Sequence, residues 1–456
     1  MESGGKMESG LDNPAFVQDS PKNERRKSKE SLASADYEPY SQRVVALPTS
    51  NLETLLHLVK GSMGSGILAM PNAFKNAGYA FGFVATIAIG VICTYTVHLL
   101  VESSYALCKR RKVPSLDYPE TMIEAMKEGP GFMPKIAPYA GYIVNFFIFW
   151  FQVGTCCVYF VFISSNLQLV LNNYTTDVID VRLYMCMILL PIMLLNCVRQ
   201  LKYLAPFSGL SNILIVSGVG IILYFIFRDG LPDIGERNWI GEARGIPLFF
   251  GTVLFALECI GVIMPLENNM KSPKNFGGAT GVFNQAMTII IFLYTGLGLL
   301  GYLEYGEKIL GSITLNLPEE VLSQVVQIMM ALAIFLTYPL QCYVAVDILW
   351  TTYISPKVDN KKYRLFGEYG VRCGIVLLTF GLAVAIPNLE LFISLVGALS
   401  LSVVGIILPP IIAFATFKHQ RRGWRVFKNI AIVIFGILGM ITGTYVSIVD
   451  IIESLF

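Results

Sequence analysis

The sequence has little charge for its length. Only 14% of its 456 residues are Asp, Glu, Lys or Arg, against about 25% in an average soluble domain. Fifteen of the charged residues fall in the first 50 positions, so the rest of the chain is poorer still. With 54% hydrophobic residues, this composition predicts an integral membrane protein. The formal net charge of +2 excludes a polybasic nucleic-acid binder.

Ligand clusters and catalytic motifs are also missing. The nine cysteines fall almost all in apolar runs and form no CxxC or Cys/His cluster. We therefore expect buried thiols that act as small hydrophobes rather than a disulfide framework or a metal site. No HExxH, GxSxG or Walker A motif is present. These absences predict a protein that is not an enzyme and needs no cofactor.

Residues 1–48 differ from the rest of the sequence. They are polar and Ser-rich, with a basic cluster, RRKSK, at Arg25–Lys29. So little apolar surface cannot offset the entropy of ordering the chain, and no apolar h-region marks a signal peptide. The sequence predicts a disordered cytoplasmic tail, open to signalling partners, before a transmembrane domain at 49–456.

Apolar runs long enough to cross a bilayer follow one another through this domain. We expect eleven transmembrane helices, at about 52–74, 80–106, 138–171, 182–199, 204–227, 246–269, 281–303, 320–349, 367–386, 391–416 and 427–452. Loops on one side of these spans carry 19 Lys and Arg and loops on the other side carry six. The positive-inside rule therefore predicts a cytoplasmic amino terminus and a lumenal or extracellular carboxyl terminus. The sequon at Asn173 falls in an outer loop, where it is a possible glycosylation site.

A faint internal repeat links the first and sixth spans. A glycine is followed by a Met-Pro pair at Gly66–Pro71 and again at Gly261–Pro265. The sixth span comes five spans after the first, an odd number, so the second copy enters the membrane with opposite polarity. Interrupted spans at matching positions predict an inverted-repeat transporter with a midplane site. Its repeats would cover about 52–227 and 246–416, with an eleventh helix at about 427–452.

The first of these spans contains a Gly-rich segment, GSMGSG. Three glycines in six positions disfavour a continuous helix, and unwound backbone at membrane depth lines a cavity or is buried in protein. Its free N–H groups would suit a carboxylate. The alternative is a small-residue packing face. The candidate substrate-binding residues are Gly61, Ser62, Met63, Gly64, Ser65 and Gly66.

Ionisable residues near the two interruptions are candidates for coupling. Glu258 lies inside an apolar run, where a carboxylate is by default functional; the alternative is a structural acceptor for freed backbone N–H groups. His57 precedes the Gly-rich segment by one turn, and imidazole titrates across mild pH differences; the alternative is a neutral packed or interfacial residue. We interpret Lys60 as a snorkelling cation, His98 as structural and Thr337 as a possible sodium ligand.

Three ordered segments of the sequence carry a specific resemblance. LLHLVKGSMGSGILAMPNAFKNAGYAFG (Leu55–Gly82), LKYLAPFSGLSNI (Leu201–Ile213) and ECIGVIMPLENNM (Glu258–Met270) resemble the proton-coupled amino acid transporter family of the amino acid/auxin permease superfamily. The resemblance covers residues 48–456. It implies an all-α, LeuT-like fold with two inverted five-helix repeats and an eleventh helix. In this fold helices one and six are broken.

The resemblance also implies roles for individual residues. His57 matches the coupling histidine, and Gly61–Gly66 would hold the substrate carboxylate through backbone amides. Carbonyls of Phe255–Gly261, a segment that includes Ala256 and Glu258, would hold the ammonium group while the Phe255 ring caps the site. Family members with an external disulfide carry cysteines in outer loops, but Asn172–Arg182 and Glu304–Glu319 contain none, so this crosslink is not expected.

The sequence as a whole predicts a secondary active transporter. We expect symport of small neutral L-amino acids with protons by alternating access, in the lysosomal or vacuolar membrane, the plasma membrane, or both. Three alternatives remain open from the sequence: a pH-independent facilitator, an amino-acid sensor whose tail is read by cytoplasmic partners, and sodium coupling.

Overall fold

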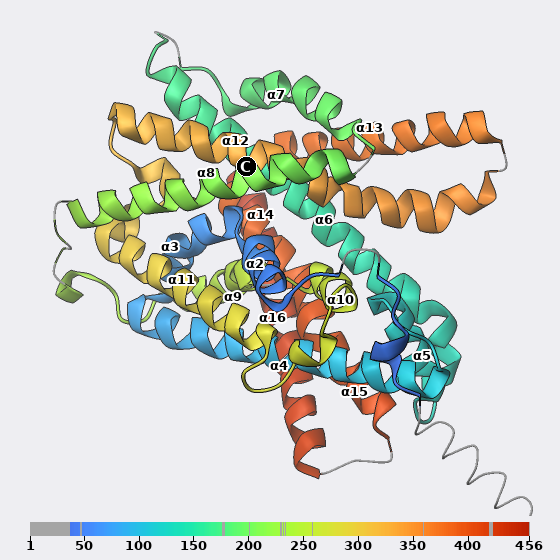
Figure 1. Ribbon diagram of the computed structural model, residues 1–456. Coiled ribbons are helices and arrows are strands. Elements are labelled where there is room, and N and C mark those ends of the chain that lie inside the picture. Colours follow the sequence, from blue (N-terminus) through green and yellow to red (C-terminus); the bar gives the residue numbers. More distant parts are fainter. Residues whose placement is uncertain are drawn as a thin grey trace, which may run out of the picture.

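The computed structural model describes residues 37–455 except 46–47, 176–177, 200, 229, 231, 233, 258, 359 and 419–422. Within these residues the chain is helical (Figure 1), and the β-type pairing consists of an isolated bridge between Thr49 and Met270. The all-α fold class predicted from the sequence is confirmed.

The helices follow the apolar runs of the sequence closely. The α-helices are α2 (Asn51–Ser62), α3 (Ser65–Ala77), α4 (Tyr79–Arg111), α5 (Tyr118–Glu128), α6 (Met133–Asn172), α7 (Val181–Asn196), α8 (Leu201–Arg228), α9 (Gly245–Leu257), α10 (Ile260–Asn268), α11 (Val282–Tyr305), α12 (Val321–Val346), α13 (Lys361–Ala385), α14 (Leu389–Val396), α15 (Leu408–Thr416) and α16 (Gly423–Leu455). Two π-helices, η6 (Asp347–Ile354) and η8 (Gly397–Ile407), continue α12 and α14. Short 3₁₀ turns are η1 (Pro39–Gln42), η2 (Ile234–Glu236), η3 (Pro273–Asn275), η4 (Gly306–Lys308), η5 (Ile313–Asn316) and η7 (Ser355–Lys357).

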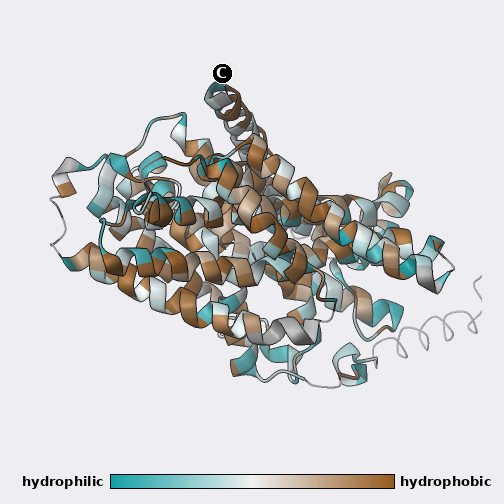
Figure 2. Cartoon of the chain, turned by 90° about the horizontal axis from the view of Figure 1, so that it is seen from above, coloured by the Kyte–Doolittle hydropathy of each residue, from teal (hydrophilic) through white to brown (hydrophobic). Residues whose placement is uncertain are grey.

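Nine segments of the described chain are long and apolar enough to cross a membrane. The two remaining predicted spans correspond to α7, which has 16 residues, and to the pair α2 and α3, which divides the first span. Each of the eleven predicted ranges therefore coincides with helix, while the number of crossings stays a prediction. Figure 2 shows hydrophobic residues along the helices and hydrophilic residues gathered in the peripheral loops. This distribution is that of a multi-pass membrane protein.

The helices associate in two groups. Within one group α11 packs against α2, α3 and α4, and α3 packs against α9. Within the other group α6 packs against α7, α12 and α13. The long α6 is the most enclosed part of the second group, with an unbroken run of buried residues from Gln152 to Ser164.

The two interrupted helices run in opposite directions. The second half of the first, α3, packs against α9, which is the first half of the other. Likewise α2 packs against α10. At each end of the two interrupted helices, the first half of one packs against the second half of the other. The two helices are therefore antiparallel. This arrangement confirms the inverted relation that the repeated Gly and Met-Pro pattern predicted.

A close backbone crossing fixes α9 against the segment α14–η8. A methyl group placed at Gly397 would lie 1.9 Å from the Gly251 carbonyl oxygen, and one at Gly251 would lie 2.2 Å from the Ser394 carbonyl oxygen. Both positions therefore require glycine. The π-helical winding of η8 begins at this crossing, and π-helical turns are rare and frequent at functional sites. The sequence analysis did not predict it.

Candidate functional site

The first helix is interrupted within the Gly-rich segment. Helix α2 ends at Ser62 and α3 begins at Ser65. Between them Met63 (φ −70°, ψ 111°) and Gly64 (φ −161°, ψ −153°) are extended. The predicted break is confirmed, and it is confined to two residues rather than all six of Gly61–Gly66.

A buried tyrosine satisfies the end of α2. The hydroxyl of Tyr294 in α11 donates a hydrogen bond to the carbonyl oxygen of Ser62. Tyr294 is fully buried. Because unpaired carbonyls at membrane depth are costly, this contact stabilises the break and ties it to α11.

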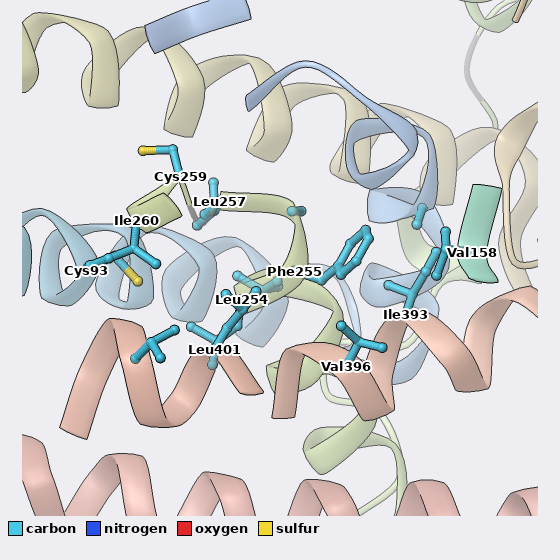
Figure 3. Close-up of a cluster of buried hydrophobic side chains, with 14 of the residues drawn as sticks. Cys93, Val158, Leu254, Phe255, Leu257, Cys259, Ile260, Ile393, Val396 and Leu401 are labelled. Carbon is cyan, nitrogen blue, oxygen red and sulfur yellow. The ribbon is translucent and has the colours of Figure 1, made fainter. Parts of the chain in front are cut away.

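The sixth predicted span is interrupted in the same way. Helix α9 ends at Leu257 and α10 begins at Ile260, with Cys259 outside helical geometry (φ −126°, ψ 17°). Figure 3 shows the chain leaving α9 at Leu257 and passing Cys259 before Ile260. Glu258 lies outside the described residues, so its predicted role in binding or proton transfer stays a prediction.

The glycines of the first break have two different surroundings. A methyl group placed at Gly64 would lie 3.6 Å from the Tyr159 hydroxyl of α6. One placed at Gly66 would lie 2.8 Å from the Cα atom of Ala256 in α9. Gly66 and Ala256 therefore form a close contact between two helices. This contact agrees with the alternative interpretation of the Gly-rich segment as a small-residue packing face. Gly64 instead faces a polar group.

Unpaired polar atoms lie beside both breaks. Gln152 in α6 is 3% exposed and Ser65 is 2% exposed. Neither Gln152 Oε1 nor Ser65 Oγ has a hydrogen-bond partner among the described residues. The Gln152 amide nitrogen lies 3.6 Å from where a methyl group at Gly261 would be. Because a buried unpaired polar atom is costly, these two atoms indicate where a polar substrate would bond.

Tyr159, Tyr294 and Gln152 were not identified from the sequence. Tyr159 also interacts with the side chain of Gln341 in α12, so its hydroxyl links α6 to α12 beside the break. A usable signal exists, because Tyr in transmembrane helices concentrates at the interfaces. A tyrosine in the middle of an apolar run needs a hydrogen-bond partner there, and both tyrosines are such cases.

The wall of the site near α9 is apolar. Phe255 is 8% exposed, and its ring meets that of Phe151 edge-on with centroids 6.4 Å apart. Figure 3 shows Phe255 directed toward Val158, Ile393 and Val396, which come from α6 and α14. Phe255 therefore contributes a hydrophobic surface close to the second break.

His57 lies on an exposed side of α2. Gly61 follows on the same side one turn later, and a methyl group there would lie 3.5 Å from Val262 Cγ2 of α10. The imidazole thus occupies the flank of α2 that turns toward α10. Lys60 beside it is half-buried. His98, in contrast, lies with Nε2 2.6 Å from Asn284 Oδ1, which fits the structural role predicted for it.

The remaining predicted residues are Thr337 and Asn173. Thr337 is engaged between helices, with its hydroxyl 2.8 Å from Ser211 Oγ and donating to the Ala333 carbonyl oxygen at 2.8 Å. Asn173 is exposed at the end of α6. All nine cysteines are free thiols, and six of them are buried as expected, whereas Cys186 is exposed and Cys197 and Cys373 are partly exposed.

A buried ion pair joins the segment before α2 to the end of α10. Arg43 Nη1 lies 3.1 Å from Glu267 Oε1, with side chains 7% and 3% exposed, and its Nε donates to the Pro114 carbonyl oxygen at 2.9 Å. The guanidinium also lies 4.7 Å from the Tyr40 ring centroid. Burial raises the pKa of the Tyr40 phenol, so it stays neutral beside Glu267. We call these four residues the Arg43 contact.

The Arg43 contact extends into a backbone pairing. The Thr49 N–H donates to the Asn269 carbonyl at 2.9 Å, and the Lys271 N–H donates to the Thr49 carbonyl at 2.9 Å. The start of α2 and the end of α10 are therefore held together at this end of the molecule. Residues 37–45 belong to the predicted tail 1–48, of which residues 1–36 lie outside the described part.

Comparisons with known proteins identify the family of the chain. Residues 48–449 match the family described as transmembrane amino acid transporter protein. The chain is 37% identical to the proton-coupled amino acid transporter-like protein pathetic of Drosophila melanogaster, over 94% of this chain and 90% of that protein. It is 27% identical to amino acid transporter AVT3A of Arabidopsis thaliana, over 89% and 91% respectively. Among solved structures it is similar to an inward-facing conformation of Mhp1, with a TM-score of 0.49, 16% identity and 91% of each chain covered.

Proposed function

The chain belongs to the family of transmembrane amino acid transporters, and we propose that it carries small neutral L-amino acids together with protons by alternating access. The family and the helical architecture make it an integral multi-pass membrane protein that transports amino acids. The substrate size, the coupling ion and the conformational cycle are the proposed parts.

The observation that carries the proposal is the pair of facing breaks with unpaired polar atoms between them. The first N–H groups of α3 and the positive end of that helix suit the substrate carboxylate. The last carbonyl groups of α9, which have no partner in the helix, and the unpaired Gln152 Oε1 suit the ammonium group. Phe255 and its neighbours leave an apolar wall for a small side chain.

Proton coupling is assigned to His57. Its imidazole lies on the side of α2 that turns toward α10, so movement of either broken helix would change its surroundings. The Drosophila relative is named a proton-coupled amino acid transporter-like protein, which supports this choice. Sodium coupling through Thr337 is less favoured, because that hydroxyl already bonds Ala333 and contacts Ser211.

The membrane and its orientation are further parts of the proposal. The excess of Lys and Arg in one set of loops supports a cytoplasmic amino terminus, in a lysosomal or vacuolar membrane or the plasma membrane. A sensing role is a second candidate, because the Arg43 contact connects the amino-terminal segment to α10. A cytoplasmic partner bound to the tail could then respond to movement of α10.

Uptake of labelled amino acids into proteoliposomes tests the proposal. A gradient from external pH 5.5 to internal pH 7.5 should drive concentrative, electrogenic uptake of a small neutral amino acid, and a sodium gradient should not. His57→Ala should abolish accumulation of the amino acid against its concentration gradient, but it should still exchange internal for external substrate. Lys60→Ala is the matched control from the same helix and should keep the pH dependence. Electroneutral, pH-independent uptake by the wild type would identify a facilitator instead.

A further inference from the structure

A cavity of about 190 Å³ lies between α4, α15 and α16, outside the broken-helix site. Its lining residues come from α4, from the end of α15 and from the first turns of α16, and the end of α15 and the start of α16 lie at the same end of the bundle (Figure 1). Its charged lining residues are Glu102 from α4 and Arg425 and Lys428 from the first turns of α16. Two cations against one carboxylate give the cavity a net positive charge. We call it the α16 pocket.

Neither cation of this pocket forms a salt bridge within the described residues. Among the arginines in the described ranges, Arg425 alone makes neither a salt bridge nor a hydrogen bond; the others bond carboxylates or backbone carbonyls. Lys428 has no carboxylate partner within the same ranges either. Its Nζ lies 3.7 Å from the centroid of the Tyr95 ring.

Tyr95 holds the floor of the pocket in place. Its hydroxyl donates a hydrogen bond to Asn429 Oδ1 at 2.9 Å. The same ring therefore positions Lys428 by a cation–π contact and joins α4 to α16. An ammonium group fixed over a ring keeps its remaining N–H bonds free for an anionic ligand.

The surroundings of the pocket are those of a bilayer surface. Of the nine candidate spans, the one formed by α16 has the smallest buried share, 17%. Trp424 and Phe427 are 70% and 63% exposed, and their rings stack with centroids 5.8 Å apart. Exposed aromatic residues at a helix end are typical of headgroup depth, so a lipid can reach the pocket from the side.

We propose that the α16 pocket binds the anionic headgroup of a membrane phospholipid. Basic pockets between transmembrane helices take such headgroups, and the cytoplasmic leaflet supplies them. Arg425 and Lys428 belong to the set of loops with the Lys and Arg excess, which the proposed topology places on the cytoplasmic side. Arg425 and Lys428 bond the phosphate, while the aromatic pair at Trp424 and Phe427 packs beside the glycerol and upper acyl region. This ligand has no part in the transport site.

The test measures binding of a fluorescent phosphatidylserine to the purified full chain in mixed micelles of detergent and phosphatidylcholine. Arg425→Gln combined with Lys428→Gln should weaken binding about 30-fold, since each cation in direct contact with the headgroup contributes about fivefold. The control combines Lys112→Gln with Lys135→Gln, which removes two exposed lysines from the same face. It should change binding less than about twofold.

Two further arms distinguish the source of the anion. Fluorescent phosphatidylcholine should bind wild type and pocket variant alike, and 10-fold excess inorganic phosphate over the lipid should not displace phosphatidylserine. Equal weakening by both double variants would overturn the proposal in favour of diffuse surface charge. Displacement by phosphate would overturn it in favour of a free-anion site. Arg425 is exposed, so Arg425→Gln alone keeps the test valid if the double variant unfolds, and it should weaken binding about fivefold.

Discussion

Gly64 and Gly66 are two positions apart and have different reasons to be glycine. Gly66 lies against the backbone of α9, so any side chain there must push two helices apart. Gly64 has room for a methyl group and is extended, a conformation open to other residues. Packing accounts for Gly66, whereas for Gly64 we propose that the substrate carboxylate approaches the backbone N–H groups there.

This difference predicts unequal effects of the same substitution. Gly66→Ala should lower the stability of the chain by about 1–3 kcal/mol, the usual cost of overpacking, and reduce the monodisperse fraction in size-exclusion chromatography. Gly64→Ala should leave that fraction near the wild-type level. If Gly64→Ala lost as much folded protein as Gly66→Ala, the distinction between the two positions would be wrong.

Gln152 gives a second prediction at the scale of a residue. Its Oε1 is unpaired among the described residues, so Gln152→Leu removes a costly buried acceptor and should leave thermal stability unchanged or raised. Apparent substrate affinity should fall about tenfold, because a hydrogen bond to a charged ammonium group is lost.

The control for Gln152 comes from the same helix. Asn166 is also buried, and its Oδ1 also has no partner in the described part of the chain. It lies fourteen residues farther along α6, about 21 Å from Gln152 along the helix axis. Asn166→Leu should therefore leave substrate affinity unchanged, and an equal loss of affinity in both variants would contradict the site.

At the scale of elements, the two broken helices are joined through the Arg43 contact. Removing one partner of a buried ion pair leaves the other charge uncompensated, which costs about 3–5 kcal/mol. Arg43→Gln and Glu267→Gln should each strongly lower the free energy of unfolding. The double variant should lose much less stability than the sum of the two single losses. Equilibrium unfolding in detergent micelles measures this coupling energy.

An exposed ion pair supplies the comparison. Arg228 and Glu320 form a salt bridge with side chains 30% and 47% exposed, and pairs of this kind contribute about 0–1 kcal/mol. The same double-mutant cycle there should yield a coupling energy below about 1 kcal/mol. Similar coupling energies at both pairs would mean that the Arg43 contact is no stronger than a surface contact.

The positions of the helices follow from the local sequence, but the way in which they pack does not. The positions of the helices and the break at Met63–Gly64 were predictable, because apolar runs and glycines act locally. The crossing of Gly251 with Gly397 and the π-helical η8 depend on which helices meet, which local propensity does not determine. Gln152 and Tyr159 were missed for the same reason. The contacts of Arg43 were not predicted, because the polar composition of the sequence around it indicated a disordered tail.

At the scale of the whole molecule, the charge asymmetry of the loops predicts the placement of both termini. An odd number of crossings with a cytoplasmic start places the carboxyl terminus in the lumen or outside the cell. In intact cells or organelles, a tag before Met1 should be cleaved only by protease on the cytoplasmic side, and one after Phe456 only from the other side. Cleavage of both tags from one side would contradict an eleven-span topology.

The central claim is that a small amino acid binds where the two broken helices face each other. Equilibrium binding of a tritiated small neutral amino acid to the purified chain tests it most directly, with Gly64→Val as the variant. Valine at this position would place methyl groups between the Tyr159 hydroxyl and the backbone N–H groups of the break. We expect saturable binding by the wild type and no binding by Gly64→Val, while Gly64→Val still elutes as a folded monodisperse protein. Undiminished binding by Gly64→Val would contradict the claim.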